Sequence, residues 1–443
     1  MCSILFSTRN ENVDLDDINY YLKFRGPDYT QSKTINRNLF IHNLLSITGE
    51  FTPQPYEDNG IVLVYNGEIY NYKNFGDYKS DGECIIPLYK KYGKDFVKQL
   101  DGEFAICLVD YNEGIAIISA DIFKTKPLYI CVNESGIGCA SYRTALQKLG
   151  HTDIKKADPN TTYIVSLADN KIIETKSIYE FDLNQHKLIY DDWIVAFENA
   201  IKKRIANTDK NIFIGLSSGY DSGLIFSELV KNKHHFFTFS LLGTENEKII
   251  VDRIAIKNPE SECYTLTKND YDYNYSHQLI GQNTEEFYYT IYSSTSDYNE
   301  RGLRLIDDAG SNNFATVCRA AKTFDCKICL SGTGADEIIS DYGFNGTKMF
   351  SHSNFGGLFP ADLSTIFPWA SFYGSTLESY IAKEEHVGGS FGIEMRYPFL
   401  DKQVVQEFLW LHQDLKNKEY KAPIDYYFNL INFPYEKQTK RGF

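Results

Sequence analysis

The chain has 443 residues, 43% of them hydrophobic, and a formal net charge of −14. That length and apolar content suffice for two or more domains with buried cores. The acidic balance and the lack of a long basic run argue against nucleic acid as a partner, because phosphate binding rests on clustered Lys and Arg. No apolar run is long enough to span a membrane and no signal peptide is visible, so we expect a soluble cytoplasmic protein.

Roughly the first 170 residues are predicted to form mainly short strands between turns. Helices are predicted over 16–24 and over 80–100, and Ser80 or Asp81 would cap the second one. Residues 168–190 are polar and lack a long period, which is typical of the approach to a linker. The predicted strands are rich in β-branched and aromatic residues and cover 38–47, 60–72, 103–111, 114–121 and 127–132.

The pattern changes after Asp191. Apolar residues at helical spacing predict a helix over 191–207, and a second helix is predicted over 223–232. Strand–loop–helix units with fully apolar strands favour a parallel sheet that helices cover on both faces. The apolar runs that predict these strands are 211–216, 234–242 and 327–330.

Nine cysteines are scattered along the chain, and their odd number favours reduced thiols over a disulfide framework. Cys326 and Cys329 have the spacing of half a zinc site, but no second pair accompanies them and their surroundings read as a buried strand. Cys2 is different, because removal of the initiator Met would leave a free α-amine beside its thiol. Either this is an accident of the start site, or Cys2 is a nucleophile whose amine, with a pKa of about 8, serves as its base.

The segment YNGE at 65–68 has two interpretations. Asn-Gly is the commonest signal of a hairpin turn. Alternatively, the side-chain amide of Asn66 and the unshielded N–H of Gly67 could hold an oxyanion, formed when a thiolate attacks an amide. Taken alone, the segment favours the turn.

The loop GLSSGYDSG, residues 215–223, lies between a predicted strand and a predicted helix. Its backbone N–H groups and the hydroxyls of Ser217, Ser218 and Ser222 could bind phosphate oxygens, and Asp221 could orient the loop or reach Mg²⁺. The alternative is an ordinary serine- and glycine-rich βα turn.

A second loop, LSGTGADE at 330–337, presents Asp336 and Glu337 after a glycine turn. Adjacent carboxylates at such a place suit Mg²⁺ that is held against phosphates. The alternative is an acidic helix start, which the helix dipole favours.

Taken together and in this order, these segments resemble the glutamine-dependent asparagine synthetase family over nearly the whole chain. Residues 1–175 are similar to a class II glutamine amidotransferase domain, which implies an Ntn-hydrolase-like αββα sandwich. Residues 185–443 are similar to a synthetase domain of the ATP-pyrophosphatase type. The resemblance rests on Met1-Cys2, RGPDYT (25–30), HNLLSI (42–47), QPY (54–56), YNGEIYNY (65–72), SDGE (80–83), LDGEFA (100–105), KPLY (126–129), LSSGYDS (216–222), LSGTGADE (330–337) and GIEMRYPFLD (392–401).

In the first domain the resemblance implies that Cys2 attacks the side-chain amide of glutamine, with its own α-amine as the base. Asn66 and Gly67 would form the oxyanion hole, and Glu68 and Asp81 match positions near the amino group of bound glutamine. A thioester forms, ammonia leaves, and water then releases glutamate.

In the second domain the resemblance implies that ATP, with Mg²⁺, adenylates a carboxylate, aspartate by default, and that pyrophosphate is released. Asp221 and Asp336 would hold Mg²⁺, and Arg396 and Lys421 match basic positions of the synthetase site. Ammonia would travel between the sites through an internal tunnel, and the assembly, if not a monomer, would be a homodimer. The residues that match the ATP site are Leu216, Ser217, Ser218, Gly219, Asp221, Ser222, Ser331 and Gly332.

The sequence departs from the family pattern at several positions. Leu44 stands where the family has an arginine that pairs with the glutamine α-carboxylate, and Arg25 and Arg37 are nearby candidates to replace it. Thr333 stands where a glutamate is expected beside the acceptor chemistry, and Ser218 replaces a glycine, which is tolerable if that position needs no positive φ. The acceptor is therefore open between aspartate and another, specialised carboxylate.

Two rival functions differ in class. A ligase similar to the β-lactam synthetases would form amides with an impaired glutaminase site, but the intact Cys2, Asn66 and Gly67 argue against it. A degenerate binding or scaffolding protein would need neither activity, and retention of the acidic pair and the lysine of the second domain argues against that.

Overall fold

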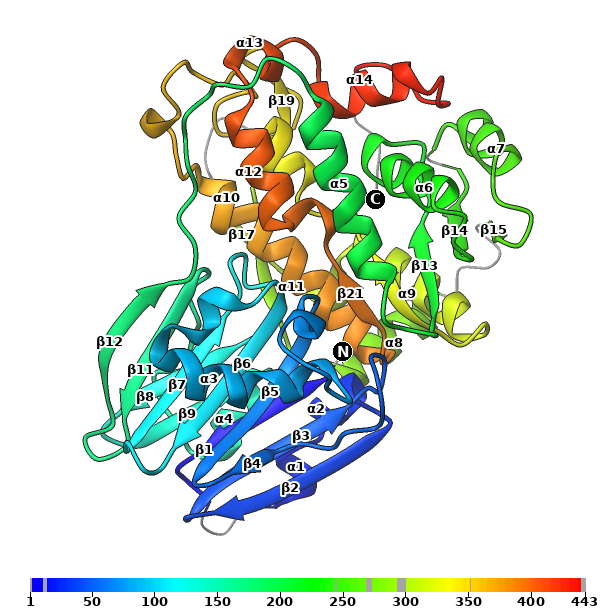
Figure 1. Ribbon diagram of the computed structural model, residues 1–443. Helices are drawn as coiled ribbons and strands as arrows, with labels where there is room; N and C mark the ends of the chain where they lie inside the picture. Colours follow the sequence, from blue (N-terminus) through cyan, green and yellow to red (C-terminus); the bar gives the residue numbers. More distant parts are fainter. Residues whose placement is uncertain are drawn as a thin grey trace.

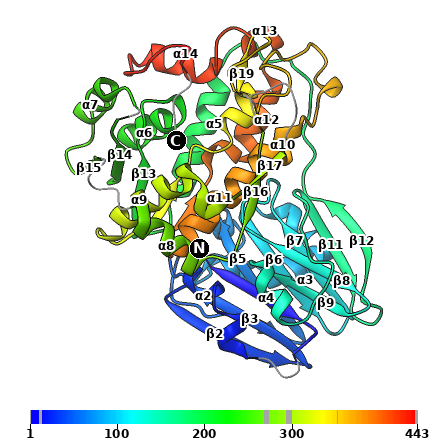
Figure 2. The same cartoon turned by 180° about the vertical axis from the view of Figure 1, so that it is seen from behind.

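The structure is a computed structural model that describes residues 2–10, 14–243, 245–267, 273–292, 300–350 and 352–439. Two antiparallel six-stranded sheets form the first part of the chain, and a parallel five-stranded sheet forms the centre of the second (Figure 1). In both views the beginning of β1 lies where the two parts meet (Figures 1 and 2). No helix in the described ranges is long and apolar enough to cross a membrane.

The two antiparallel sheets contain the strands that the sequence predicts, together with several that it does not. The first sheet has the order β10-β8-β9-β1-β3-β2, with β1 Ser3–Ser7, β2 Tyr29–Ile35, β3 Asn38–Leu44, β8 Tyr129–Asn133, β9 Gly136–Ala140 and β10 Lys155–Lys156. The second has the order β12-β11-β7-β6-β5-β4, with β4 Tyr56–Asp58, β5 Ile61–Ile69, β6 Gly102–Asp110, β7 Ile115–Ala120, β11 Thr161–Ser166 and β12 Lys171–Ser177.

Three apolar clusters define the layers of this first part. One fills the space between the two sheets and contains alternate side chains of β1, β5 and β6. A second packs the outer face of the second sheet against α3, Ile85–Tyr92. A third packs the outer face of the first sheet against α1, α2 and α4, which are Leu15–Ile18, Leu22–Arg25 and Arg143–Lys148. The predicted αββα sandwich is confirmed.

The second part is built on the parallel sheet β15-β14-β13-β18-β21, as predicted. Its strands are β13 Asn211–Gly215, β14 Phe237–Leu241, β15 Glu262–Leu266, β18 Cys326–Leu330 and β21 Glu394–Arg396. Two short hairpins, β16 Tyr288–Tyr292 with β17 Glu300–Arg304 and β19 Gly343–Phe344 with β20 Thr347–Lys348, lie outside it. The helices are α5 Asp191–Ile205, α6 Tyr220–Lys231, α7 Glu247–Ala255, α8 Tyr273–Asn283, α9 Ala309–Lys322, α10 Ala370–Tyr373, α11 Ser375–Ser390, α12 Lys402–Trp410, α13 Gln413–Lys416 and α14 Ala422–Leu430.

Three local predictions are wrong. The helix expected over 16–24 is split into α1 and α2, and the one expected over 80–100 consists of α3 between two 3₁₀ segments. Ser80 stands at the N-cap position of the first 3₁₀ segment but makes no side-chain capping hydrogen bond, and the Asp81 carboxylate accepts hydrogen bonds from Tyr65 Oη and Ile69 N instead. The polar segment 168–190 contains the edge strand β12 before its extended portion.

The cysteine prediction is confirmed. All nine thiols are free. Cys326 and Cys329 are buried in β18, and the described residues contain no group of three or more His, Cys, Asp or Glu side chains placed to hold a metal. These two cysteines are core residues of β18.

Candidate active sites

Cys2 lies just before β1 and is 9% exposed. The backbone N–H of Leu45 donates to its sulfur, with a nitrogen–sulfur distance of 3.5 Å. Burial raises the pKa of the Cys2 thiol to about 11, so the thiol is neutral at ordinary pH. A buried neutral thiol is inert until a base removes its proton, so reactivity here needs a base within reach.

Strand alternation directs Cys2, Asn66 and Glu68 into one layer. Side chains two residues apart in a strand share a face. Cys2 therefore continues the inward face of β1, and Asn66 and Glu68 continue the inward face of β5. The residues that define this inward face, between the two sheets, are Ile4, Phe6, Val62 and Val64.

Asn66 and Gly67 lie within β5, where they pair with Ala105 and Phe104 of β6, so the hairpin-turn interpretation is wrong. Gly67 has φ +140°, and a Cβ there would lie 1.9 Å from the carbonyl oxygen of Glu103, so no larger residue fits. The Asn66 side chain is fully buried, and within the described residues neither its nitrogen nor its oxygen has a hydrogen-bond partner. An unpaired buried amide costs about 1–3 kcal/mol, which is consistent with a group reserved for a ligand.

Glu68 and Asp81 are both buried, but both carboxylates already have partners. Thr48 Oγ1 donates to the Glu68 carboxylate at 2.8 and 3.0 Å, and Arg396 Nη2 lies 3.0 Å from Glu68 Oε1. Burial raises the pKa of Glu68 well above its ordinary value, and burial also raises the pKa of Asp81 to about 6. The predicted glutamine contacts are therefore embedded in a network that extends to the second part of the chain.

Neither Arg25 nor Arg37 takes the place of the arginine that the family has at position 44. Arg25 is fully buried, and its guanidinium donates to the backbone oxygen of Cys2 and to Glu385. Arg37 lies in the turn between β2 and β3, seven residues before Leu44, which at about 3.3 Å per residue is more than 20 Å along the strand. Leu44 shares the inward face of β3 with Phe40, so its side chain points into the layer that holds Cys2.

Restoring an arginine at this position, Leu44→Arg, is expected to lower the KM for glutamine by at least about tenfold, because a hydrogen bond to a charged group contributes about 1.5–3 kcal/mol. The measurement is glutamate release as a function of glutamine concentration. Leu44→Met, which conserves volume without charge, is the matched control and should leave the KM unchanged. An unchanged KM in a folded Leu44→Arg protein would show that this side chain does not face the glutamine carboxylate.

The two predicted nucleotide loops meet in space. Strands β13 and β18 are parallel neighbours, so the loops at their carboxyl ends, 215–222 and 331–337, lie side by side. They line one cavity with a volume of about 410 Å³. The predicted residues that line it are Ser217, Gly219, Asp221, Ser222, Ser331, Gly332 and Asp336.

Lys421 joins the two loops. Its Nζ lies 2.5 Å from Asp221 Oδ1 and 2.8 Å from Asp336 Oδ1, although the three residues are far apart in sequence. Burial lowers the pKa of Lys421, but the two carboxylates outweigh burial and hold the pKa above its ordinary value. Two carboxylates that border a cavity fit Mg²⁺, which is usually bound by one or two carboxylates together with substrate phosphates.

Lys421 and three other predicted residues lie outside the set that lines this cavity. Leu216 is fully buried in the core, and Ser218 donates through its backbone N–H to Glu245 at 2.8 Å, with no positive φ. Arg396 is 1% exposed and bonded to Glu394 and to Glu68, so it lies toward the Cys2 side.

Arg253 of α7 supports the first loop and was not predicted from the sequence. Its Nη1 donates to the carbonyl oxygens of Ser217 and Gly219 at 2.6 and 2.9 Å. Burial lowers the pKa of Arg253 to about 9. No motif surrounds this arginine, so only the fold reveals it.

Strand β21 separates the two sites. Met395 lines the cavity of the second part, whereas the next residue, Arg396, contacts Glu68 of the first. Successive residues of a strand point to opposite faces. The wall between the sites is therefore one strand thick at this point.

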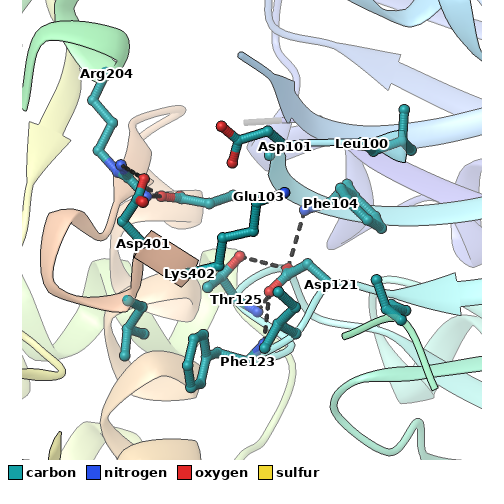
Figure 3. A pocket seen from close by; sticks show the side chains of 14 residues that line it. Leu100, Asp101, Glu103, Phe104, Asp121, Phe123, Thr125, Arg204, Asp401 and Lys402 are labelled. Carbon is teal, nitrogen blue, oxygen red and sulfur yellow. Dashed lines mark hydrogen bonds and ion pairs between the residues drawn. The ribbon is translucent and has the colours of Figure 1, made fainter. Parts of the chain in front are cut away.

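Buried charges also join the two parts. Arg204 lies between Glu103 and Asp401, at 2.8 and 2.9 Å, beside a small pocket (Figure 3). Lys126 Nζ donates to Glu385 Oε1 at 3.1 Å and to the carbonyl oxygen of Met395 at 2.5 Å. Buried pairs of this kind fix the mutual orientation of the groups they join, because breaking one typically costs about 3–5 kcal/mol.

Comparison with known proteins agrees with this two-part arrangement. A glutamine amidotransferase domain matches residues 1–182, and asparagine synthase matches residues 194–365. Asparagine synthetase (glutamine-hydrolyzing) 1 of Arabidopsis thaliana is 26% identical, over 94% of this chain and 71% of the relative. The Homo sapiens asparagine synthetase (glutamine-hydrolyzing) is 24% identical, over 88% and 73%.

Among solved structures, the allosteric regulatory enzyme of purine biosynthesis is similar over 60% of this chain and 80% of that chain, with 14% identity and a TM-score of 0.33. The family matches define the chain as a glutamine amidotransferase domain joined to an asparagine synthase domain. The chain therefore carries both domains, and over most of its length it is similar to proteins named asparagine synthetase (glutamine-hydrolyzing).

Proposed function

We propose that this protein transfers the amide nitrogen of glutamine to a carboxylate that it first adenylates with ATP. Cys2, after removal of the initiator Met, is the nucleophile and its α-amine is the base. Asn66 and Gly67 hold the oxyanion, and Glu68 and Asp81 lie near the glutamine amino group. The unpaired, fully buried Asn66 amide supports this assignment, since it faces the layer that holds Cys2.

The second half of the proposal concerns the cavity between the loops 215–222 and 331–337, which would bind ATP. Mg²⁺, where bound, supplies charge neutralisation at the phosphates, and Asp221 and Asp336 would hold it. Lys421 positions both carboxylates, and Arg396 acts through Glu68 rather than at the phosphates. Aspartate is the default acceptor. We place the domain division between residues 175 and 185.

The observation that carries the proposal is the convergence of both loops on one cavity, where Lys421 contacts the Asp221 and Asp336 carboxylates from outside the lining. A carboxylate is a poor acyl donor until AMP makes one of its oxygens a leaving group, so ATP and the acceptor must occupy the same site. A one-strand wall, β21, lies between this cavity and the glutaminase residues. Ammonia released at the glutaminase residues would therefore have to pass only β21 to reach the cavity.

The test is pyrophosphate release from Mg²⁺-ATP, screened over carboxylates with glutamine present and with aspartate as the first. We expect one carboxylate to raise the rate well above the background of ATP alone, and AMP to appear in equal amount. If aspartate is inactive and another carboxylate is active, the acceptor assignment is wrong but the reaction class stands. If every carboxylate leaves the rate at background, the proposed adenylation is contradicted.

A further inference from the structure

Position 333 carries a threonine where the resemblance leads us to expect a glutamate, but this threonine contacts a glutamate of another element, Glu384 of α11. Thr333 Oγ1 donates to Glu384 Oε1 at 3.0 Å. Glu384 lies on α11, 51 residues further along the chain, and both residues line the cavity between the nucleotide loops. The cavity therefore retains a carboxyl group beside the second loop, although the sequence pattern of that loop has lost it.

Glu384 also lies on the side of the cavity that faces the glutaminase site. The next residue of α11, Glu385, accepts from Arg25 Nη2 at 2.7 Å, and Arg25 Nε donates to the carbonyl oxygen of Cys2 at 3.2 Å. One turn of α11 therefore contributes both Glu385, which is linked to Cys2 through Arg25, and Glu384, which lines the cavity. Ammonia released at Cys2 would enter the cavity near this turn.

The chemistry of this carboxyl suits proton transfer. Its second oxygen, Oε2, is buried and has no hydrogen-bond partner within the described ranges. Burial raises the pKa of Glu384 to about 7. Hydrogen bonding to Ser331 and Thr333 and the charge of Lys383 oppose this rise, and the charge of Glu337 adds to it. A base works best when its pKa lies near the operating pH, because it can then both accept and release a proton.

We propose that Glu384 is the general base of the amidation step, taking the place of the family glutamate that Thr333 replaces. This inference rests on the proposed function. The nitrogen lone pair of ammonia forms a bond to the acyl carbon, and the carbonyl π pair moves onto oxygen. Glu384 takes one proton from the nitrogen. The pair on oxygen then returns, the bond from carbon to the AMP oxygen breaks, and amide, AMP and one proton are the products.

The experiment compares wild type with Glu384→Gln, using ammonium chloride as the nitrogen source and the carboxylate identified by the screen. Pyrophosphate release and amide formation are measured separately, and hydroxylamine traps the acyl-adenylate as a hydroxamate. In Glu384→Gln we expect amide formation to fall by at least about 100-fold, since a general base contributes about 10²- to 10⁴-fold. Pyrophosphate release in the first turnover, and hydroxamate formation when hydroxylamine consumes the acyl-adenylate, should stay within about threefold of wild type.

Two controls separate this role from a structural one. Thr333→Val removes the hydrogen bond but keeps the carboxyl, so its loss of amide formation should be at least tenfold smaller than that of Glu384→Gln. Glu378 lies on the same helix and pairs with Lys124 away from the cavity. Glu378→Gln should therefore form amide from ammonia at the wild-type rate.

Each outcome has a distinct meaning. Amide formation by Glu384→Gln within threefold of wild type would overturn the inference alone. An equal loss of first-turnover pyrophosphate release and of amide formation would assign Glu384 to binding or folding and would also overturn the inference. Wild type that releases no pyrophosphate with any carboxylate would contradict the proposed function, and this inference with it.

Discussion

Replacing Cys2 with alanine is expected to lower glutamine-dependent amide formation by at least about a thousandfold, because the variant has no sulfur to attack the glutamine amide. Amide formation from ammonium chloride should remain within about threefold of wild type, since the cavity between the nucleotide loops does not include Cys2. The measurements are glutamate release and amide formation with each nitrogen source. The ratio of the two activities reports the role of the thiol independently of any change in protein concentration or stability.

Cys2→Ser is the matched comparison, because it keeps the shape of the side chain but offers a weaker nucleophile. Intact mass measurement of the wild-type protein accompanies this experiment and should show that the initiator Met has been removed. Undiminished glutamate release by Cys2→Ala would contradict the assignment. A mature chain that retains Met would remove the proposed base.

The second large effect is expected from Lys421→Met. This substitution removes the charge that lies between the partly buried Asp221 and the buried Asp336. Loss of one preorganised electrostatic group at a reaction site typically costs about 10²- to 10³-fold in rate, so pyrophosphate release should fall by about a hundredfold or more with either nitrogen source. Glutamate release from glutamine should persist, because the Cys2 site contains no part of this pair.

Lys416→Met provides the control for burial. Lys416 is 3% exposed and donates to backbone carbonyls of α12 and its end, away from the cavity. We expect Lys416→Met to lower the thermal stability of the protein, with no loss of pyrophosphate release beyond the loss of folded protein. If Lys421→Met released pyrophosphate at a rate within tenfold of wild type, the contact of Lys421 with Asp221 and Asp336 would have no part in adenylation.

A sequence pattern predicts a strand well when the strand is buried on both faces, which gives a continuous apolar run, or on one face, which gives alternation. β5, β6 and β13 consist of apolar or alternating residues, and the structure places them within a few residues of the expected ranges. The region 80–100 failed because helix propensity alone does not detect that the Asp81 carboxylate is used by Tyr65 and Ile69. A tertiary contact there replaced the local cap.

The candidate residues show the same limit. The two loops could be predicted as phosphate-binding from their glycines and hydroxyls, but their adjacency depends on β13 pairing with β18. Asn66 looked like a turn residue, because the sequence does not show that Gly67 is placed for close contact with Glu103 of the neighbouring strand. Glu384 had no signal at all, since its partner Thr333 lies on a distant element.

The most direct test of the account follows the nitrogen atom itself. The protein is given glutamine labelled with ¹⁵N in the side-chain amide, Mg²⁺-ATP and the active carboxylate, and the product amide is examined by mass spectrometry. The account predicts that the label appears in the product amide in wild type and is absent from it in Cys2→Ala, even when unlabelled ammonium supports turnover. Labelled product from Cys2→Ala, or unlabelled product from wild type, would contradict it.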